Sequence, residues 1–213
     1  MKAFIFDMDG VIIDSEPLHS RVKLETLKKY GLDFSESRLS YYMGRATKEL
    51  FGDAAREAGR TDLDIGEMVD YKHAAYLEHL RNDDTVQPIT GVRELIAALK
   101  AKHIPIGLAS SAGQVVIDAV LKKFVLEDSF AAILSGAELK RSKPNPEIYL
   151  LTAKRLNVAP ADCTVLEDAA SGIAAAKAAG MYCIAYRNPN SGNQDLSRAD
   201  IVVENIDEVI RLL

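Results

Sequence analysis

Two aspartates, Asp7 and Asp9, stand two positions apart, directly after a short apolar run and before Gly10. If the chain stays extended there, alternate side chains share a face and the two carboxylates lie close together. Carboxylates held that close repel each other, and a divalent cation is the usual remedy. The same residue types are common in tight turns, so a turn is an equally good interpretation. A calcium loop is excluded, because its further ligands are missing.

Two serines and a lysine farther along the chain precede expected helices. Ser110 and Ser111 are either a helix N-cap or part of an anion site, since free N–H groups and the positive end of the helix dipole lie at such a position. Lys143 lies in a Lys-Pro-Asn-Pro stretch just before another helix start. It is either a solvated surface lysine or a positive charge for the same anion.

Two adjacent acids, Glu167 and Asp168, directly follow a further apolar run. A turn or a helix cap would account for them, but two acids together at the carboxyl end of a buried strand are less usual. In an open parallel sheet this edge is where ligands bind. Acids for Mg²⁺, hydroxyl and amide donors for phosphate, and a lysine for residual charge are the groups that phosphoryl transfer needs.

The elements that would position these residues are short apolar runs that alternate with helical patterns. The apolar runs predict buried strands at residues 2–6, 104–109, 131–134, 164–166, 183–185 and 201–203. Helical spacing follows Gly91, covers 116–124 and 171–179, and lies behind Asn145-Pro146, which we expect to be an N-cap followed by a first-turn proline. Strands that alternate with helices predict a parallel sheet covered on both faces.

One stretch breaks this alternation and predicts helices alone. The expected helices cover 17–30, 36–43, 47–58 and 64–80, and the first three end before Gly31, Gly44 and Gly59, where a left-handed cap would fall. We therefore expect a helical unit at residues 15–82, inserted into an α/β core made of residues 1–14 and 83–213. The polar, turn-rich stretch 188–200 is expected to be a loop.

The motifs resemble those of the haloacid dehalogenase (HAD) superfamily, and most closely its small phosphatases and β-phosphoglucomutases. The resemblance lies in stretches 7–19, 109–111, 142–146 and 166–173, which occur in the family's order, and it covers the whole chain. It implies a three-layer α/β fold: a doubly wound parallel sheet of strand order 3-2-1-4-5, with a helical cap inserted after the first strand. The helix-only stretch fits that cap.

The resemblance also implies roles for the residues at the sheet edge. Asp7 resembles the nucleophile that becomes an aspartyl phosphate, and Asp9 resembles the general acid and base. Asp7, the Asp9 backbone carbonyl and Asp168 would hold Mg²⁺, with Glu167 as a ligand or directly behind the ligands. Because the dehalogenases carry no acid at the position of Asp9, carbon–halogen chemistry is not expected here.

Ser110, the Ser111 amide and Lys143 would hold the phosphoryl oxygens. Mg²⁺ and Lys143 would together offset the negative charge that opposes attack of a carboxylate on a phosphate dianion.

Candidate specificity residues lie in the expected cap. His19 is at a family position that lines the site, although a hinge or helix-surface role fits it equally well. Arg45 and Lys72 are candidates for a distal anion of the substrate, and a solvated surface position is the alternative for each. Three tyrosines are expected to pack within the cap: Tyr41, Tyr42 and Tyr76.

These residues predict a magnesium-dependent phosphatase that hydrolyses a small phosphorylated metabolite, with a sugar phosphate as the expected substrate. The first alternative is a phosphosugar mutase of the β-phosphoglucomutase type. Family mutases carry a serine and a lysine where Ala112 and Gly113 stand here, and an arginine where Thr47 stands. A non-catalytic phospho-ligand sensor is the second alternative, and it is disfavoured because both aspartates are present.

Composition and net charge narrow the classes of binding partner that we expect. The chain has 213 residues, 48% of them hydrophobic and 27% charged, which is typical of a globular protein. A net charge of −5 gives no electrostatic reason to expect nucleic acid or an anionic membrane as a partner. Two cysteines, Cys163 and Cys183, make neither a metal spacing nor a disulfide framework. No signal-peptide core or membrane span is expected, so we predict a cytoplasmic protein, with a monomer favoured.

Overall fold

The computed structural model describes residues 1–42 and 45–213. They divide into two compact units: residues 1–14 with 85–213, called the core unit here, and residues 15–84, called the helical unit. The division therefore falls two residues later than the sequence analysis placed it. In the described part of the chain, no helix is both long enough and apolar enough to cross a membrane.

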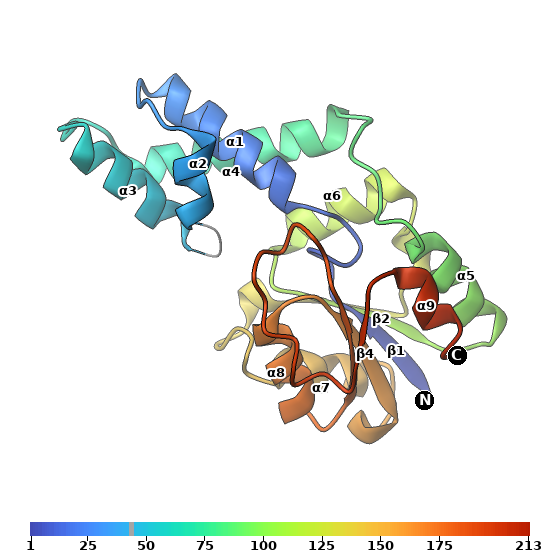
Figure 1. The fold of residues 1–213 in the computed structure, drawn as a ribbon. Coiled ribbons are helices and arrows are strands. Elements are labelled where there is room, and N and C mark those ends of the chain that lie inside the picture. Colours follow the sequence, from blue (N-terminus) through green and yellow to red (C-terminus); the bar gives the residue numbers. More distant parts are fainter. Residues whose placement is uncertain (43–44) are drawn as a thin grey trace. The chain divides into compact units, whose positions relative to one another are not determined.

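The core unit is built on one parallel sheet (Figure 1). Its order is β3-β2-β1-β4-β5-β6, which confirms the expected order 3-2-1-4-5 and places the strand expected at 201–203 on the β5 edge. β2 and β4 each include one residue that the sequence analysis placed after the strand, so Ser110 and Glu167 end their strands. The strand bounds are β1 Ala3–Phe6, β2 Ile106–Ser110, β3 Ala132–Ser135, β4 Cys163–Glu167, β5 Tyr182–Tyr186 and β6 Ile201–Val203.

Helices cover both faces of this sheet, as expected. α7 (Glu147–Arg155) and α8 (Ala170–Ala178) pack on one face, and α5 (Val92–Ala101), α6 (Gln114–Phe124) and α9 (Ile206–Ile210) lie on the other (Figure 1). The start of α7 differs slightly from the expectation. Pro146 is the N-cap rather than the first helical residue, and the Asn145 side chain still caps the helix by accepting the Glu147 N–H at 3.0 Å.

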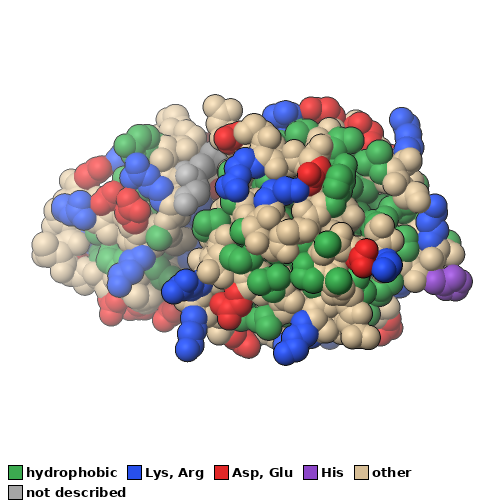
Figure 2. All heavy atoms as spheres, turned by 90° about the horizontal axis from the view of Figure 1, so that it is seen from below, with side chains coloured by type: hydrophobic (Ala, Val, Ile, Leu, Met, Phe, Trp, Pro, Cys, Tyr) green, Lys and Arg blue, Asp and Glu red, His purple; other side chains and the backbone are tan. Residues whose placement is uncertain are grey.

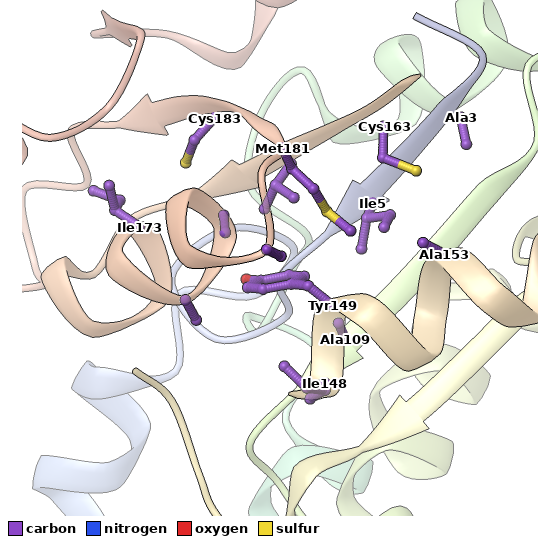
Figure 3. Close-up of a cluster of buried hydrophobic side chains, with 14 of the residues drawn as sticks. Ala3, Ile5, Ala109, Ile148, Tyr149, Ala153, Cys163, Ile173, Met181 and Cys183 are labelled. Atoms are coloured by element: carbon purple, nitrogen blue, oxygen red, sulfur yellow. The ribbon is translucent and has the colours of Figure 1, made fainter. Parts of the chain in front are cut away.

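Strand β1 is buried on both faces. Period-two alternation places Ala3 and Ile5 in the buried cluster beneath α7 and α8 (Figure 3), whereas Phe4 and Phe6 pack together with ring centroids 4.9 Å apart. All four side chains are completely buried. A polar side chain is therefore expected only after the strand ends, and the first residue there is Asp7.

The helical unit contains α1 (Glu16–Lys29), α2 (Glu36–Leu39), α3 (Thr47–Glu57) and α4 (Ile65–Asn82), with a 3₁₀ turn at Ser40–Tyr42. α1 and α3 both pack on α4 and bury a core that includes Leu27, Phe51 and Met68. Gly31 and Gly59 adopt φ values of +73° and +66°, which confirms left-handed caps at those positions. The expected end of the second helix, at Met43 and Gly44, lies outside the described residues.

On the face drawn in Figure 2, acidic and basic side chains are interspersed rather than gathered by sign.

Candidate active site

Three adjacent strands bring buried polar residues to one edge of the sheet. Asp7 extends the pairing of β1 by one residue, because its N–H donates to the Leu166 carbonyl at 3.0 Å. β2, on one side of β1, ends at Ser110, and β4, on the other, ends at Glu167. Asp7 is 7% exposed, Ser110 is fully buried and Glu167 is 1% exposed. The polar groups that the sequence analysis selected at strand ends are thus inside the core unit.

After Asp7 the chain leaves the sheet in a tight turn. The N–H groups of Val11, Ile12 and Ile13 all point to the Met8 carbonyl oxygen, at 2.8–3.3 Å. Asp9 lies at this turn, and its charge acts on Asp7. Two further carboxylates, those of Glu167 and Asp168, reach Asp7 from the end of β4.

Gly10 is required in this turn for two reasons. Its φ of +79° is a left-handed conformation that favours glycine. A Cβ atom at this position would also lie only 1.9 Å from Asp168 Oδ2. The Asp168 carboxylate therefore rests directly against the backbone of the Asp9–Gly10 turn.

Lys143 is a buried counter-charge and not a solvated surface lysine. Its Nζ donates to Asp7 Oδ1 at 2.6 Å, to Glu167 Oε1 at 2.8 Å and to the Ala109 carbonyl at 3.0 Å. The side chain is 6% exposed. Burial alone would lower the pKa of this ammonium group, but the two facing carboxylates outweigh it and raise the pKa above its ordinary value. Lys143 is therefore held protonated next to Asp7.

The described acidic cluster consists of Asp7, Glu167 and Asp168, whose oxygens lie within 4.8 Å of one another. Burial raises the pKa of Asp7 well above its ordinary value; Lys143 opposes this shift, and Glu167, Asp168 and Asp9 add to it. Burial and Glu167 also raise the pKa of Asp168, to about 7. Three carboxyl groups face one lysine, and carboxylate oxygens are the ligands of hard divalent cations, so the cluster fits Mg²⁺.

The Ser110–Ser111 segment forms a small loop between β2 and α6. Ser110 Oγ accepts the Ala112 N–H at 3.0 Å, and Ser135 Oγ donates to the Ala112 carbonyl at 2.7 Å. Gly136 packs closely against the loop, since a Cβ there would lie 3.2 Å from the Ser110 carbonyl oxygen. The loop is thereby fixed at the end of β2 beside Asp7, where amide and hydroxyl donors would meet an anion.

The sequence analysis missed two residues that contact this cluster and one that contacts the adjacent Gly10 turn. The Tyr149 hydroxyl donates to Glu167 Oε1 at 2.7 Å, and the Ser191 hydroxyl donates to Asp168 Oδ2. Asn188 donates through Nδ2 to the Gly10 carbonyl at 3.0 Å. Tyr149 lies in an ordinary apolar helix pattern, and the other two lie in the 188–200 loop. Only the polar character of that loop hinted at them.

Within the helical unit, His19 and Lys72 meet across the α1–α4 pair. His19 Nδ1 and Lys72 Nζ are 3.0 Å apart, and the imidazole stacks on Tyr76 with ring centroids 4.2 Å apart. Burial, followed by the charges of Lys72, Lys23 and His73, lowers the pKa of His19 to about 3. His19 is therefore neutral, and it accepts the hydrogen bond from Lys72. Lys72 is only 4% exposed, so it is not a solvated surface residue.

Arg45 lies on the surface of the helical unit. It pairs with Glu49 at 3.1 Å, and its guanidinium carbon lies 4.6 Å from the centroid of the Tyr41 ring. Tyr42 and Tyr76 are buried, as expected for packing residues, but Tyr41 is 69% exposed. The expectation for Tyr41 is therefore wrong: its ring stacks with Arg45 outside the core.

Comparison with known proteins places the chain among proteins of one family. The family model described as haloacid dehalogenase-like hydrolase matches residues 4–186. Hexitol phosphatase B of Escherichia coli K12 is 34% identical over 212 residues, which are 97% of this chain and 93% of that protein. β-Phosphoglucomutase of Bacillus subtilis is 31% identical over 98% of this chain and 92% of its own length.

The solved structures agree with the fold. The crystal structure of a candidate β-phosphoglucomutase from Thermotoga maritima has a TM-score of 0.86 and 30% identity, and it covers 100% of this chain and 98% of its own. The resemblance seen in the motifs therefore extends over both units of the chain.

Proposed function

The chain belongs to the haloacid dehalogenase-like hydrolase family, and on that premise we propose that it is a magnesium-dependent phosphatase of small phosphorylated sugars or sugar alcohols. One observation carries the proposal. Asp7 lies buried at the end of β1, with Lys143 2.6 Å from its Oδ1 and the oxygens of Glu167 and Asp168 close by. This arrangement supplies a nucleophile, a fixed positive charge and a cation site at one point.

The reaction follows from the groups at that point. A carboxylate oxygen of Asp7 attacks phosphorus, the bond to the substrate oxygen breaks, and Asp9 protonates the leaving alkoxide. Asp9 then removes a proton from water, which attacks the aspartyl phosphate and releases inorganic phosphate and free Asp7. The Ser110–Ser111 loop and Lys143, which exchanges one of its three protein hydrogen bonds for a phosphoryl oxygen, hold the phosphoryl group throughout. Bound Mg²⁺, held by Asp7, Asp168 and the Asp9 carbonyl, would supply additional positive charge to the transferring group.

The substrate class rests on the relatives and on the helical unit. A relative named hexitol phosphatase B points to a phosphorylated polyol. We propose that the helical unit acts as a cap, in which His19 and Lys72 contact the hydroxyl-rich part of the substrate and Arg45 lies nearer the surface. His19 and Lys72 together offer hydrogen-bonding groups, which suit the hydroxyl groups of a polyol phosphate.

The direct test is a panel of phosphate esters assayed for phosphate release with and without Mg²⁺. We expect hexitol and hexose phosphates to be hydrolysed fastest, and chelation of Mg²⁺ to abolish the activity. Asp7→Asn should lower kcat at least about 10³-fold, because the amide cannot form the acyl phosphate. A D7N variant that retains normal turnover would contradict the mechanism.

The alternative is a phosphosugar mutase, which the similarity to β-phosphoglucomutase of Bacillus subtilis keeps open. A mutase must bind a second phosphate, so that its bisphosphate intermediate can turn round. The residues Ala112, Gly113 and Thr47 offer no charged side chain for it. Isomerisation of β-glucose 1-phosphate, primed by glucose 1,6-bisphosphate and faster than phosphate release, would decide for the mutase.

A further inference from the structure

Tyr149 is a buried tyrosine whose hydroxyl group packing alone does not explain. It lies on α7 with no exposed surface, and its ring sits among the apolar side chains of the core cluster that includes Ile5 and Met181 (Figure 3). A phenylalanine would occupy the same apolar space. The hydroxyl instead donates to Glu167 Oε1 at 2.7 Å. Burial raises the pKa of Tyr149 well above its ordinary value, so the group remains a donor.

Glu167 uses both of its oxygens fully. Oε1 accepts from the Tyr149 hydroxyl and from Lys143 Nζ, and Oε2 accepts from the backbone N–H groups of Asp168 at 3.0 Å and Ala169 at 3.1 Å. A carboxylate offers about four lone-pair directions, and here four donors occupy them. These contacts make Glu167 an anchor for Lys143.

The position of that anchor is fixed by its surroundings. The Glu167 side chain lies so close to α8 that a Cβ on Gly172 would be 1.6 Å from Oε1. Tyr149 also contacts Lys143 directly, with Nζ 4.9 Å from the centroid of its ring. One tyrosine therefore constrains Lys143 in two ways, through its ring face and through the oxygen to which the lysine donates.

We propose that Tyr149 is a positioning residue for phosphoryl transfer, which acts through Glu167 to hold the Lys143 ammonium beside Asp7. This inference rests on the proposed function, since it gives Lys143 the phosphoryl oxygens to bind. Without the hydroxyl, Oε1 keeps a single donor and draws Lys143 toward Glu167 and away from Asp7. The phosphoryl group then loses part of its positive partner, whereas Asp7 and Asp168 remain available to Mg²⁺.

The first experiment is Tyr149→Phe in the full-length protein, which removes the hydroxyl and keeps the ring. We expect kcat to fall about tenfold and the dissociation constant of inorganic phosphate to rise by a similar factor, the size of one charge-assisted hydrogen bond. Phosphate binding is measured by calorimetry in the presence of Mg²⁺. The Mg²⁺ dissociation constant, measured on the same variant, should change less than twofold. A purely structural tyrosine would lower the melting temperature and leave phosphate affinity unchanged.

Tyr30→Phe is the matched control. It removes the same kind of bond, a tyrosine hydroxyl that donates to Glu67 Oε1 at 2.9 Å, from the helical unit. We expect its phosphate affinity and kcat to equal those of the wild type. An equal loss in both variants would contradict a specific role for Tyr149.

The second experiment is a double-mutant cycle with Glu167→Gln. If the hydroxyl acts through Glu167, Y149F should weaken phosphate binding about tenfold in the wild type and less than twofold in the E167Q background. Additive effects of Y149F and E167Q would overturn the inference.

The failure of this inference is distinguishable from failure of the proposed function. A wild-type protein that neither hydrolyses phosphate esters nor binds phosphate would refute the function itself. A wild type that does both, together with a Y149F variant that does both equally well, would refute only the role of Tyr149.

Discussion

At the scale of single residues, the Lys143 ammonium is the counter-charge that stabilises the buried carboxylates at the edge of the sheet. Its three hydrogen bonds to Asp7, Glu167 and the Ala109 carbonyl are all 3.0 Å or shorter. Both carboxylates are almost fully buried, so each depends on a nearby positive charge. A lysine in this position contributes to folding as well as to the proposed binding of phosphate.

We therefore expect Lys143→Met to lose both properties. Removing one partner of a buried ion pair typically costs about 3 kcal/mol, because it leaves uncompensated buried charge. Denaturant unfolding at pH 7 should show a loss of this size, and kcat/KM should fall at least about 10²-fold. Lys177→Met removes a partly exposed pair with Asp200 and is the control, with an expected loss below about 1 kcal/mol. Equal losses in the two variants would contradict this account.

At the scale of elements, two close backbone approaches determine where the acids lie. Gly10 lies against Asp168, and Gly172 of α8 lies against Glu167. Neither contact leaves space for a methyl group, because a Cβ would be 1.9 Å from one carboxylate oxygen and 1.6 Å from the other. The first turn after β1 and the first turns of α8 therefore set the geometry of the β4 end.

Glycine-to-alanine substitutions should consequently have opposite effects at two helical positions. Gly172→Ala should displace Glu167, reduce kcat at least about tenfold and destabilise the protein by about 1–3 kcal/mol, as overpacking does. Gly52→Ala in α3 has nothing within 4 Å of the new Cβ and should stabilise the protein by about 0.5–1 kcal/mol through helix propensity. Thermal unfolding and an ester assay measure both effects. Stabilisation by G172A would show that Glu167 is not held against α8.

At the scale of the whole molecule, the chain interrupts one folding unit with another. Residues 1–14 supply β1 and Asp7, and residues 85–213 supply every other strand, so the core unit is complete only across the inserted helices. The helical unit has a core of its own and a buried polar pair, His19 and Lys72. This division fits separate tasks: chemistry in the core unit and substrate selection in the helical unit.

Lys72→Met tests that division of tasks. We expect KM for a hexitol phosphate to rise about tenfold, and hydrolysis of a small acyl phosphate such as acetyl phosphate to change less than twofold. The variant also removes the nearest charge that lowers the pKa of His19, so this pKa should rise from about 3 toward the ordinary value. Imidazole NMR signals followed from pH 3 to pH 8 measure the shift. Equal losses on both substrates would place Lys72 outside substrate recognition.

Much of the fold was predictable from local pattern. Short apolar runs such as 2–6 and 201–203 indicated strands because a buried parallel strand must be apolar on both faces. Glycines at positions 31 and 59 marked helix ends because a left-handed cap favours them. The candidate residues Asp7, Ser110, Lys143, Glu167 and Asp168 were selected for the same reason: each stands where a strand ends or a helix is about to begin.

The sequence by itself thus determined the order of the elements, since that order depends on local periodicity. It also determined the acids, serines and lysine of the candidate site, since these stand at the ends of neighbouring strands. Only the tertiary structure decided how they are joined. The Tyr149 hydroxyl reaches Glu167 across 18 positions, and Ser191 reaches Asp168 across 23, through contacts that no periodicity encodes. These residues become partners because helices pack on the sheet and glycines permit the close approach.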